Sequence, residues 1–525
     1  MASRRAGILI PLFSMPSSRS WGIGEIADIG EFARWLESAG MDVLQLLPIN
    51  ELLPGETSPY SAMSAMAIDP QFIAVEQVDD FVATGGVQSL PSELHRQLSA
   101  VRASAKIDYA GVRRLKDAAL RRAFAYFHET EWDRETRRAA ALQGYLQEQA
   151  WWLDDYALFR ALHAHHGGRP WGEWPAALQR RDGEELNRAR RELADDILYR
   201  QYLQWIADSQ WAEARRAAGS LALFGDLPFM VSRDSADVWA HQDLFRLDAS
   251  VGVPPDAFSE TGQDWGLPVY RWDVLRERGF DWLHQRARRN AALFSGYRID
   301  HLVGFYRTYF RPHDGGPAQF VPANEEDQIR LGEGIVEIFR SAGSEVTAED
   351  LGLVPDFVRE SLARLNVPGY KVQRWERRWH VEGQPFKDPR AYPEVAVVTS
   401  GTHDTVPMAA WWQHAPLEER QAVLAIPSIQ EALTDEDRAA ALSQSPLTPT
   451  LREALLTSLY GSSAELLILP IQDVFGWTDR INKPATVNGG NWTWRMPWTA
   501  DRLTSEPAAV AMAAQLAQWS REYVR

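Results

Sequence analysis

The sequence of 525 residues predicts an α/β protein, a (β/α)8 TIM barrel with a large helical insertion and extended active-site loops. Three observations support this fold. Eight short apolar runs recur along the chain, and helical periodicity or loop sequence separates them. Runs that are apolar throughout indicate strands buried on both faces, as in a parallel sheet. The content of 45% hydrophobic and 24% charged residues is that of a globular protein.

The candidate strands share a short apolar or β-rich core between polar or helical segments. They are residues 7–13, 41–49, 221–231, 295–300, 344–349, 370–375, 395–401 and 464–474. Helical segments are predicted between several of them. Residues 26–40 carry apolar side chains at helical spacing and end at Gly40, a residue type that often terminates helices. Residues 328–342 repeat this pattern before Gly343.

The spacing of the predicted strands is uneven, which locates two insertions in a single catalytic barrel spanning residues 1–525. Residues 72–211 are charged and helical in pattern, so we expect a helical insertion between the second and third strands. Residues 232–272 are rich in proline, glycine, aspartate and aromatic residues. We expect them to form an active-site loop insertion, because a long irregular segment in a compact chain is usually functional.

Composition excludes several function classes. With 55 basic and 71 acidic residues the net charge is −16, which disfavours nucleic-acid backbones and anionic membrane surfaces. There is no cysteine, so disulfides, thiolate nucleophiles and cysteine-bound zinc are excluded. No apolar run approaches the roughly 20 residues needed to cross a bilayer. We therefore expect a cytoplasmic protein without a cofactor or a metal ion.

Four carboxylates lie at or near the ends of predicted strands, where the active site of a barrel is found. They are Asp226, Asp300, Glu349 and Asp404. A single acid in such a place is usually a helix cap or an ion-pair partner. Four acids at the same end of one barrel are much harder to explain in that way, so we interpret them as a catalytic cluster.

The arrangement around Asp300 suggests a specific chemistry. Arg298 lies two residues earlier, so both side chains point to the same side of a strand. The guanidinium would keep the carboxylate ionised, as a covalent nucleophile requires. A second carboxyl group crowded by apolar walls and other acids would have a raised pKa and could act as a general acid. Such a pair indicates a retaining reaction at a glycosidic bond.

Three motifs carry a resemblance to a known family. Residues 296–301 (GYRIDH), 348–352 (AEDLG) and 401–404 (GTHD) look like barrel motifs of the α-amylase clan. More narrowly, they resemble the 4-α-glucanotransferases, the amylomaltases and disproportionating enzymes of glycoside hydrolase family 77. Other segments are similar to that family as well. They are residues 21–24, 58–61, 152–156, 201–205, 234–239, 252–256, 265–266, 270–272, 480–482 and 490–495.

The resemblance implies a role for each matching residue. Asp300 would be the nucleophile that forms a β-glucosyl-enzyme, and Glu349 would be the acid and then the base. Asp404 would stabilise the transition state, helped by His403 and Arg298. Malto-oligosaccharides and α-glucans would be the substrates, and residues 254–265 would cover the acceptor side. The implied sugar contacts are Tyr60, Asp226, Asp256, Phe258, Gln263, Trp265, Arg480 and Asn482.

Two positions depart from related patterns. Val231 stands five residues after Asp226, where most amylases carry asparagine and amylomaltases do not, so it favours the transferases. Ala257 precedes Phe258, where some members of the family have an aromatic residue. This difference bears on acceptor binding and product size and leaves the chemistry unchanged.

Other functions fit parts of the sequence. An α-1,4-glucan hydrolase of the same clan would share the covalent intermediate, whereas a non-catalytic glucan-binding barrel would lack one of the acids. Residues 22–27 match a dinucleotide fingerprint, but eight residues separate it from the preceding strand, which disfavours NAD. His163, His165 and His166 could suggest a metal site, although a solvated helix end is favoured.

Overall fold

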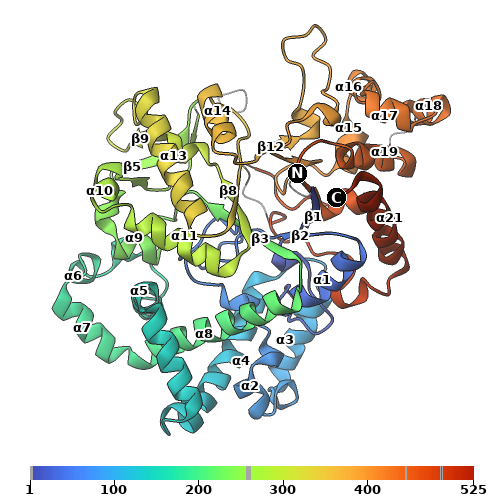
Figure 1. Ribbon diagram of the computed structural model, residues 1–525. Helices are drawn as coiled ribbons and strands as arrows, with labels where there is room; N and C mark the ends of the chain where they lie inside the picture. The colour runs from blue at the N-terminus through green and yellow to red at the C-terminus, as the bar shows by residue number, and fades with distance from the viewer. Residues whose placement is uncertain (1–3, 256–261, 444–445, 485, 487–488) are drawn as a thin grey trace.

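The computed structural model describes residues 4–255, 262–443, 446–484, 486 and 489–525. Within these residues, eight parallel strands close into a barrel, which confirms the predicted fold (Figure 1). Each strand overlaps one of the eight apolar runs. The strands are β1 (Arg5–Leu9), β2 (Val43–Gln45), β3 (Ala222–Pro228), β8 (Gly296–Asp300), β11 (Glu345–Ala348), β12 (Gly369–Val372), β13 (Ala396–Thr399) and β14 (Leu466–Pro470).

Neighbouring strands in the barrel follow the order β1, β14, β13, β12, β11, β8, β3 and β2. The register between β3 and β8 places Asp226 opposite Arg298 and Pro228 opposite Asp300. The register between β8 and β11 places Ile299 opposite Ala348. Because all strands run in one direction, their carboxyl ends share one rim, and the predicted acids are collected there.

Helices cover the outside of the barrel. The two predicted helices are present as α1 (Asp28–Ser38) and α13 (Glu325–Ser341). The side chain of Asn324 accepts a hydrogen bond from the main-chain nitrogen of Asp327, which satisfies a free donor at the start of α13. Further helices around the barrel are α10 (Trp272–Glu277), α11 (Asp281–Leu293), α12 (Val303–Tyr306), α14 (Asp356–Arg364), α20 (Ile471–Phe475) and α21 (Pro507–Tyr523).

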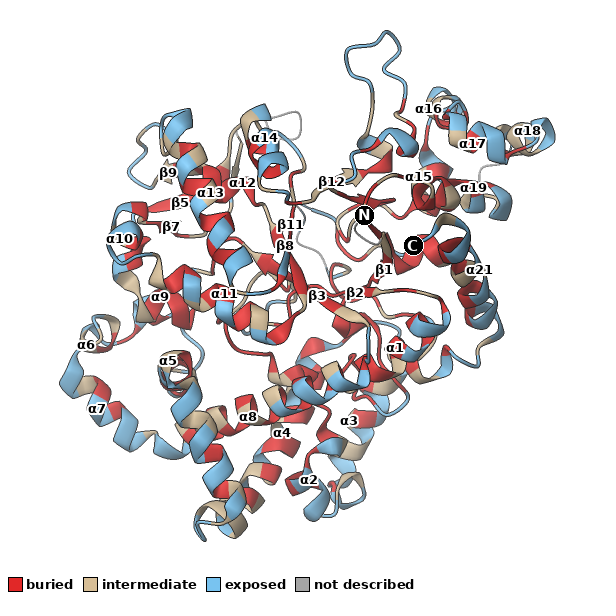
Figure 2. Cartoon of the chain, viewed as in Figure 1, coloured by how far each residue is buried: buried red, intermediate tan, exposed pale blue. Residues whose placement is uncertain are grey.

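Between β2 and β3 the chain is helical and lies against one side of the barrel (Figure 1). The helices are α2 (Asp79–Ala83), α3 (Ser92–Ala103), α4 (Tyr109–Phe127), α5 (Arg137–His165), α6 (Ala176–Gln179), α7 (Gly183–Glu192) and α8 (Ala194–Ala217). Helix α8 packs on both α5 and α1, which joins the helices to the barrel. Figure 2 shows buried residues along the faces of α4 and α8 that are turned inward.

At the end of α5, His165 is exposed and His166 is partly exposed, as the sequence favoured, whereas His163 differs from that expectation. His163 is buried and packs against the ring of Phe159. Its pKa is lowered to about 4, because burial disfavours the charged imidazolium. In the part of the chain that the structure describes, no group of histidine, aspartate and glutamate side chains is placed to hold a metal ion.

The segment after β3 is folded into short strands and a helix. It contains α9 (Ala236–Ala240), β4 (Phe245–Arg246), β5 (Ala249–Val253), β6 (Gln263–Asp264) and β7 (Val269–Tyr270). Strands β5 and β6 join β9 (Thr308–Pro312) and β10 (Gln319–Val321) in an antiparallel sheet with the order β10, β9, β5 and β6. This sheet therefore ties the segment after β3 to the chain that follows β8.

The chain between β13 and β14 forms a cluster of helices across the barrel from the helices that lie between β2 and β3 (Figure 1). They are α15 (Met408–His414), α16 (Leu417–Leu424), α17 (Pro427–Ala432), α18 (Asp435–Ser443) and α19 (Pro449–Tyr460). None of the helices in the described ranges is long and apolar enough to cross a membrane.

Candidate active site

A buried arginine connects two acids at the rim of the barrel. Arg298 Nη1 donates a hydrogen bond to Asp226 Oδ2 at 2.5 Å, and its Nη2 donates to Asp300 Oδ1 at 2.7 Å. The Asp226 side chain is fully covered, whereas that of Asp300 is 28% exposed. Within the described chain, Asp300 Oδ2 accepts no hydrogen bond. Asp300 thus presents one unpaired carboxylate oxygen to an incoming substrate.

The charges of this cluster depend on each other. Burial would lower the pKa of Arg298, but the charges of Asp226 and Asp300 outweigh burial and hold it well above its usual value. Burial raises the pKa of Asp226 to about 6, with Arg298 opposing the rise and Asp300 adding to it. Arg298 is therefore a permanent cation that favours the ionised form of Asp226.

Glu349 follows β11 and lies beside Asp300. Its main-chain nitrogen donates to the carbonyl of Ile299 at 3.0 Å. Its carboxylate accepts hydrogen bonds from the main-chain nitrogens of His301 at 2.9 Å and Leu351 at 3.1 Å. Burial raises the pKa of Glu349 to about 7; Arg298 opposes this rise and the negative charge of Asp300 adds to it. A carboxyl group that is neutral near pH 7 can act as a general acid.

The hydrogen bond from His301 depends on an unusual backbone. His301 has a φ of 45°, in the left-handed region that side chains other than glycine seldom adopt. The residue directly after Asp300 thereby turns its N–H group toward Glu349. Sequence reasoning did not select His301 as a functional residue, because the strain is a property of the backbone and leaves no mark on the motif.

Asp404 is held by groups from two loops. Asn482 Nδ2 donates to Asp404 Oδ1 at 2.6 Å, and His403 Nε2 lies 3.4 Å from Asp404 Oδ2. Arg480 donates to the main-chain oxygen of Asp404. Burial would raise the pKa of Asp404, but His403 and Asn482 hold it well below its usual range. Burial would also lower the pKa of His403, yet the charge of Asp404 raises it.

Tyr60 joins the two halves of the site. Its Oη donates to Asp226 Oδ2 at 3.0 Å and lies 3.1 Å from His403 Nε2. The Tyr60 ring stacks on the imidazole of His403 with a centroid distance of 5.6 Å. The Trp492 ring contacts both of them, at 5.9 Å and 5.8 Å. Trp492 was not predicted as a site residue, although it lies in a segment that matched the family.

Trp265 lies beside His301, the residue directly after Asp300. Its ring meets the edge of the His301 ring at a centroid distance of 4.8 Å. Its Nε1 donates to Gln263 Oε1 at 3.2 Å. Asp256 and Phe258, predicted to contact the sugar, lie outside the described residues. The other predicted site residues are connected to one another by hydrogen bonds, ion pairs and ring contacts. Trp265 joins them through its contact with the His301 ring, and Gln263 joins them through its hydrogen bond to Trp265.

The barrel and its rim define a class of protein. A strand-end aspartate bound to arginine, a glutamic acid with a pKa of about 7 and a third, strongly acidic aspartate lie at the same end of the strands. A pair of carboxyl groups at one rim, one of them suited to be an acid, is typical of enzymes that cleave glycosidic bonds.

The chain belongs to the 4-alpha-glucanotransferase family, whose sequence model matches residues 10–501. It is 34% identical over 509 residues to a 4-alpha-glucanotransferase of Thermus thermophilus, covering 94% of this chain and 95% of the relative. It is 32% identical over 510 residues to a 4-alpha-glucanotransferase of Chlamydia pneumoniae, covering 95% and 93%. These matches confirm the family that the motifs indicated.

A solved structure supports the same assignment. Amylomaltase from Streptococcus agalactiae, determined in complex with acarbose, is 27% identical and superimposes with a TM-score of 0.83 over 99% of each chain. Amylomaltase from Corynebacterium glutamicum shares the fold, with a TM-score of 0.81 over 98% of this chain and 75% of that one. The protein is therefore an enzyme of the 4-alpha-glucanotransferase family.

Proposed function

We propose that this enzyme transfers α-1,4-glucan segments between malto-oligosaccharides through a covalent glucosyl-enzyme, with Asp300, Glu349 and Asp404 as its catalytic residues. One observation carries the proposal. Asp300 offers a free oxygen while Arg298 holds its other oxygen, and Glu349, which follows the neighbouring strand, accepts a hydrogen bond from the main-chain nitrogen of the residue directly after Asp300. A nucleophile and an acid are thus available on the same rim.

In the first step, the free oxygen of Asp300 attacks the anomeric carbon of the donor. The bond between that carbon and the leaving oxygen breaks, and Glu349 gives its proton to the departing oxygen. The new bond is an ester of β configuration, since the attack comes from the face opposite the leaving group. Asp404 is strongly acidic and stays ionised, so it can stabilise the positive charge that develops on the sugar ring.

The second step uses the change in charge at Asp300. When Asp300 becomes an ester it loses the negative charge that helps to raise the pKa of Glu349. The pKa of Glu349 then falls, so the carboxylate can take the proton of an acceptor hydroxyl. That hydroxyl attacks the anomeric carbon and releases Asp300. Two inversions give net retention, and the product carries a new α-1,4 bond when the acceptor is the 4-hydroxyl of a glucan.

Preference for a sugar acceptor requires that water be kept out. Trp265 and Gln263 border the side of the site next to His301, where a flat ring could stack on an acceptor sugar. The likeness to the Streptococcus agalactiae amylomaltase, determined in complex with acarbose, supports sugar binding by this enzyme.

A cytoplasmic location, favoured by the absence of cysteine, belongs to the same proposal and is testable by cell fractionation.

Incubation with maltotriose tests the function. Transfer should give glucose together with maltotetraose and longer chains, while the total number of reducing ends stays constant. An increase in reducing ends without longer chains would identify the enzyme as a hydrolase. No product at all would favour the non-catalytic glucan-binding barrel. The variant Asp300→Asn serves as the matched control, because it removes the nucleophile and keeps the size of the side chain.

A further inference from the structure

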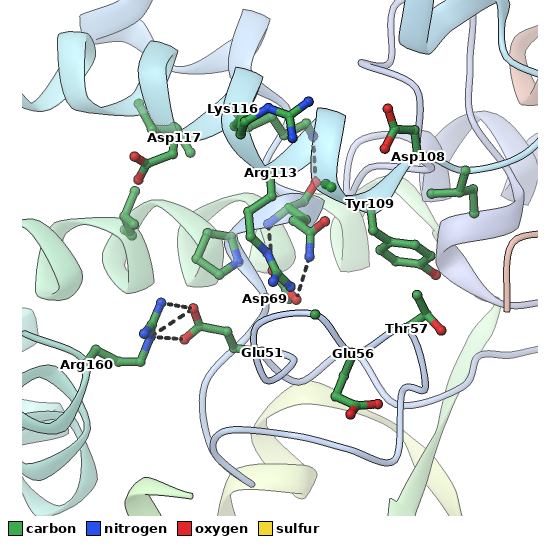
Figure 3. A pocket seen from close by; sticks show the side chains of 18 of the residues that line it. Glu51, Glu56, Thr57, Asp69, Asp108, Tyr109, Arg113, Lys116, Asp117 and Arg160 are labelled. Atoms are coloured by element: carbon green, nitrogen blue, oxygen red, sulfur yellow. Dashed lines mark hydrogen bonds and ion pairs between the residues drawn. The ribbon is translucent and has the colours of Figure 1, made fainter. Parts of the chain in front are cut away.

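Buried aspartates outside the catalytic group hold loops of this protein in place through main-chain nitrogens. Figure 3 shows one of them, Asp69, in the wall of a cavity next to α4. Its carboxylate accepts hydrogen bonds from the main-chain nitrogens of Leu52 at 3.0 Å and Gln71 at 2.9 Å. A carboxylate that accepts main-chain N–H groups in this way fixes the path of the chain at those residues. Asp350 is another buried aspartate, and it directly follows the proposed acid Glu349.

Asp350 fastens the end of β11 to the neighbouring strand β12. The residue is 6% exposed, and its Oδ1 accepts a hydrogen bond from the main-chain nitrogen of Tyr370 at 2.7 Å. In the described chain, β11 pairs with β12 at Ala348 and Gly369. The hydrogen bond of Asp350 lies just beyond that pair. The chain is thus attached to β12 immediately before and immediately after Glu349.

Two cations balance the charge of the Asp350 carboxylate. Its Oδ2 lies 3.7 Å from Lys371 Nζ and 3.9 Å from Arg359 Nε. Arg359 belongs to α14, and its Nη1 also donates to the carbonyl oxygen of Val354 at 3.0 Å. Opposite charges offset the cost of burying a carboxylate. A charged acceptor also makes a stronger hydrogen bond to the Tyr370 N–H group than a neutral one would.

Gly369 leaves the space that this contact needs. A Cβ atom on Gly369 would lie 2.6 Å from Asp350 Oδ2 and 2.8 Å from Asp350 Cγ. Both distances are shorter than a normal contact, so a larger residue would push the carboxylate aside. Glycine is the residue that allows such a close approach to the backbone. The residue type at position 369 is therefore matched to the carboxylate of Asp350.

The attachment at Asp350 fixes the direction of the next main-chain N–H group. Leu351 N donates to Glu349 Oε1 at 3.1 Å, and His301 N donates to Glu349 Oε2 at 2.9 Å. The first donor belongs to the turn that Asp350 attaches to β12, and the second lies at the end of β8. If Asp350 loses its bond, the turn is free to shift and Glu349 loses one of these two donors. A displacement of about 1 Å can lower a reaction rate by about 10²-fold.

We propose that Asp350 is a positioning residue for the general acid. Through Tyr370 on one side and Leu351 on the other, it holds the carboxyl group of Glu349 where that group can protonate the departing oxygen. The inference rests on the proposed function, in which Glu349 is the acid. Loss of Asp350 should therefore slow reactions of donors that need a proton and spare donors that do not.

Two donors separate positioning of the acid from general damage to the site. Maltotriose needs a proton on its leaving oxygen, whereas α-glucosyl fluoride does not. In the full-length enzyme, Asp350→Ala should lower kcat/KM with maltotriose by about 10- to 100-fold. The first turnover of fluoride release from α-glucosyl fluoride should stay within about threefold of the unmodified rate, because the nucleophile is unchanged.

Two further variants perturb the same contact in different ways. Asp350→Asn keeps an oxygen for the Tyr370 N–H group and should retain kcat/KM with maltotriose within about fivefold. Gly369→Ala keeps the carboxylate but displaces it. It should lower kcat/KM with maltotriose by about tenfold or more and again spare α-glucosyl fluoride. If Asp350→Ala does not fold, as judged by thermal unfolding, Gly369→Ala takes its place.

Asp356→Asn is the matched control. Asp356 Oδ1 lies 3.7 Å from Arg359 Nη1, so this variant removes the same charge beside the same arginine. The Asp356 side chain is 94% exposed on α14, away from the turn that carries Glu349. The rates with both donors should therefore change by less than about twofold.

Glu349→Gln, measured alongside, separates failure of this inference from failure of the proposed function. If Glu349→Gln loses activity equally with both donors, Glu349 is not the acid, and the inference about Asp350 falls with the proposed function. If Glu349→Gln spares α-glucosyl fluoride, the proposed function stands. The inference is then overturned by an equal loss with both donors in Asp350→Ala, by full activity of that variant with maltotriose, or by the same loss in Asp356→Asn.

Discussion

Replacement of Glu349 by glutamine tests the assignment of the general acid. The rise of its pKa from 4.5 to about 7 corresponds to roughly 3 kcal/mol in favour of the neutral acid. The enzyme should therefore be in the productive state below pH 7, and only about a tenth of it should remain protonated at pH 8. The value of kcat/KM with maltotriose should fall as pH rises through 7. This follows because the first step requires the proton of Glu349.

Glu349→Gln should lower kcat/KM with maltotriose by about 10²- to 10⁴-fold, the usual contribution of a general acid. With an α-glucosyl fluoride donor the first step should be largely spared, because fluoride leaves without a proton. The assay is the burst of fluoride released in the first turnover, measured across pH 6 to 9 for both proteins. Release by the variant should lack the decline above pH 7 seen with maltotriose. A variant that keeps this decline would show that another group titrates, and the assignment would fail.

Three further changes probe the rest of the site. Asp300→Asn should abolish both transfer and hydrolysis of maltotriose, since an amide cannot form the ester; a sizeable remaining rate would exclude Asp300 as the nucleophile. Tyr60→Phe should lower kcat/KM by about 10- to 100-fold through loss of its hydrogen bond to the charged Asp226; unchanged kinetics would show that this bond is dispensable. Trp265→Ala should raise the ratio of new reducing ends to elongated products, and a constant ratio would remove Trp265 from acceptor selection.

The barrel was predictable because most of its strands lie in apolar runs that are buried on both faces. The ends of the strands were less predictable, since hydrogen-bond register determines them. β1 begins at Arg5, two residues before the predicted run, because Arg5 pairs with Leu466 of β14. β2 keeps only three residues of a run of nine, because only Val43–Gln45 pair with both neighbours.

Part of the site was also accessible from the sequence. The spacing of Arg298 and Asp300 predicted that the two side chains share one face of a strand, and the structure shows them hydrogen-bonded. The link from Tyr60 to His403 was different. These residues are 343 positions apart and come from separate loops, so only the closed barrel brings them together. The family resemblance named both residues but could not supply their contact.

Trapping the covalent intermediate tests the central claim most directly. Glu349→Gln enzyme treated with α-glucosyl fluoride should form the ester and then hydrolyse it slowly, because the base of the second step is missing. Proteolysis and mass spectrometry should find one added glucosyl unit on the peptide that contains Asp300. A glucosyl unit on another residue, or no covalent adduct while fluoride is released with inversion at the anomeric carbon, would contradict the account.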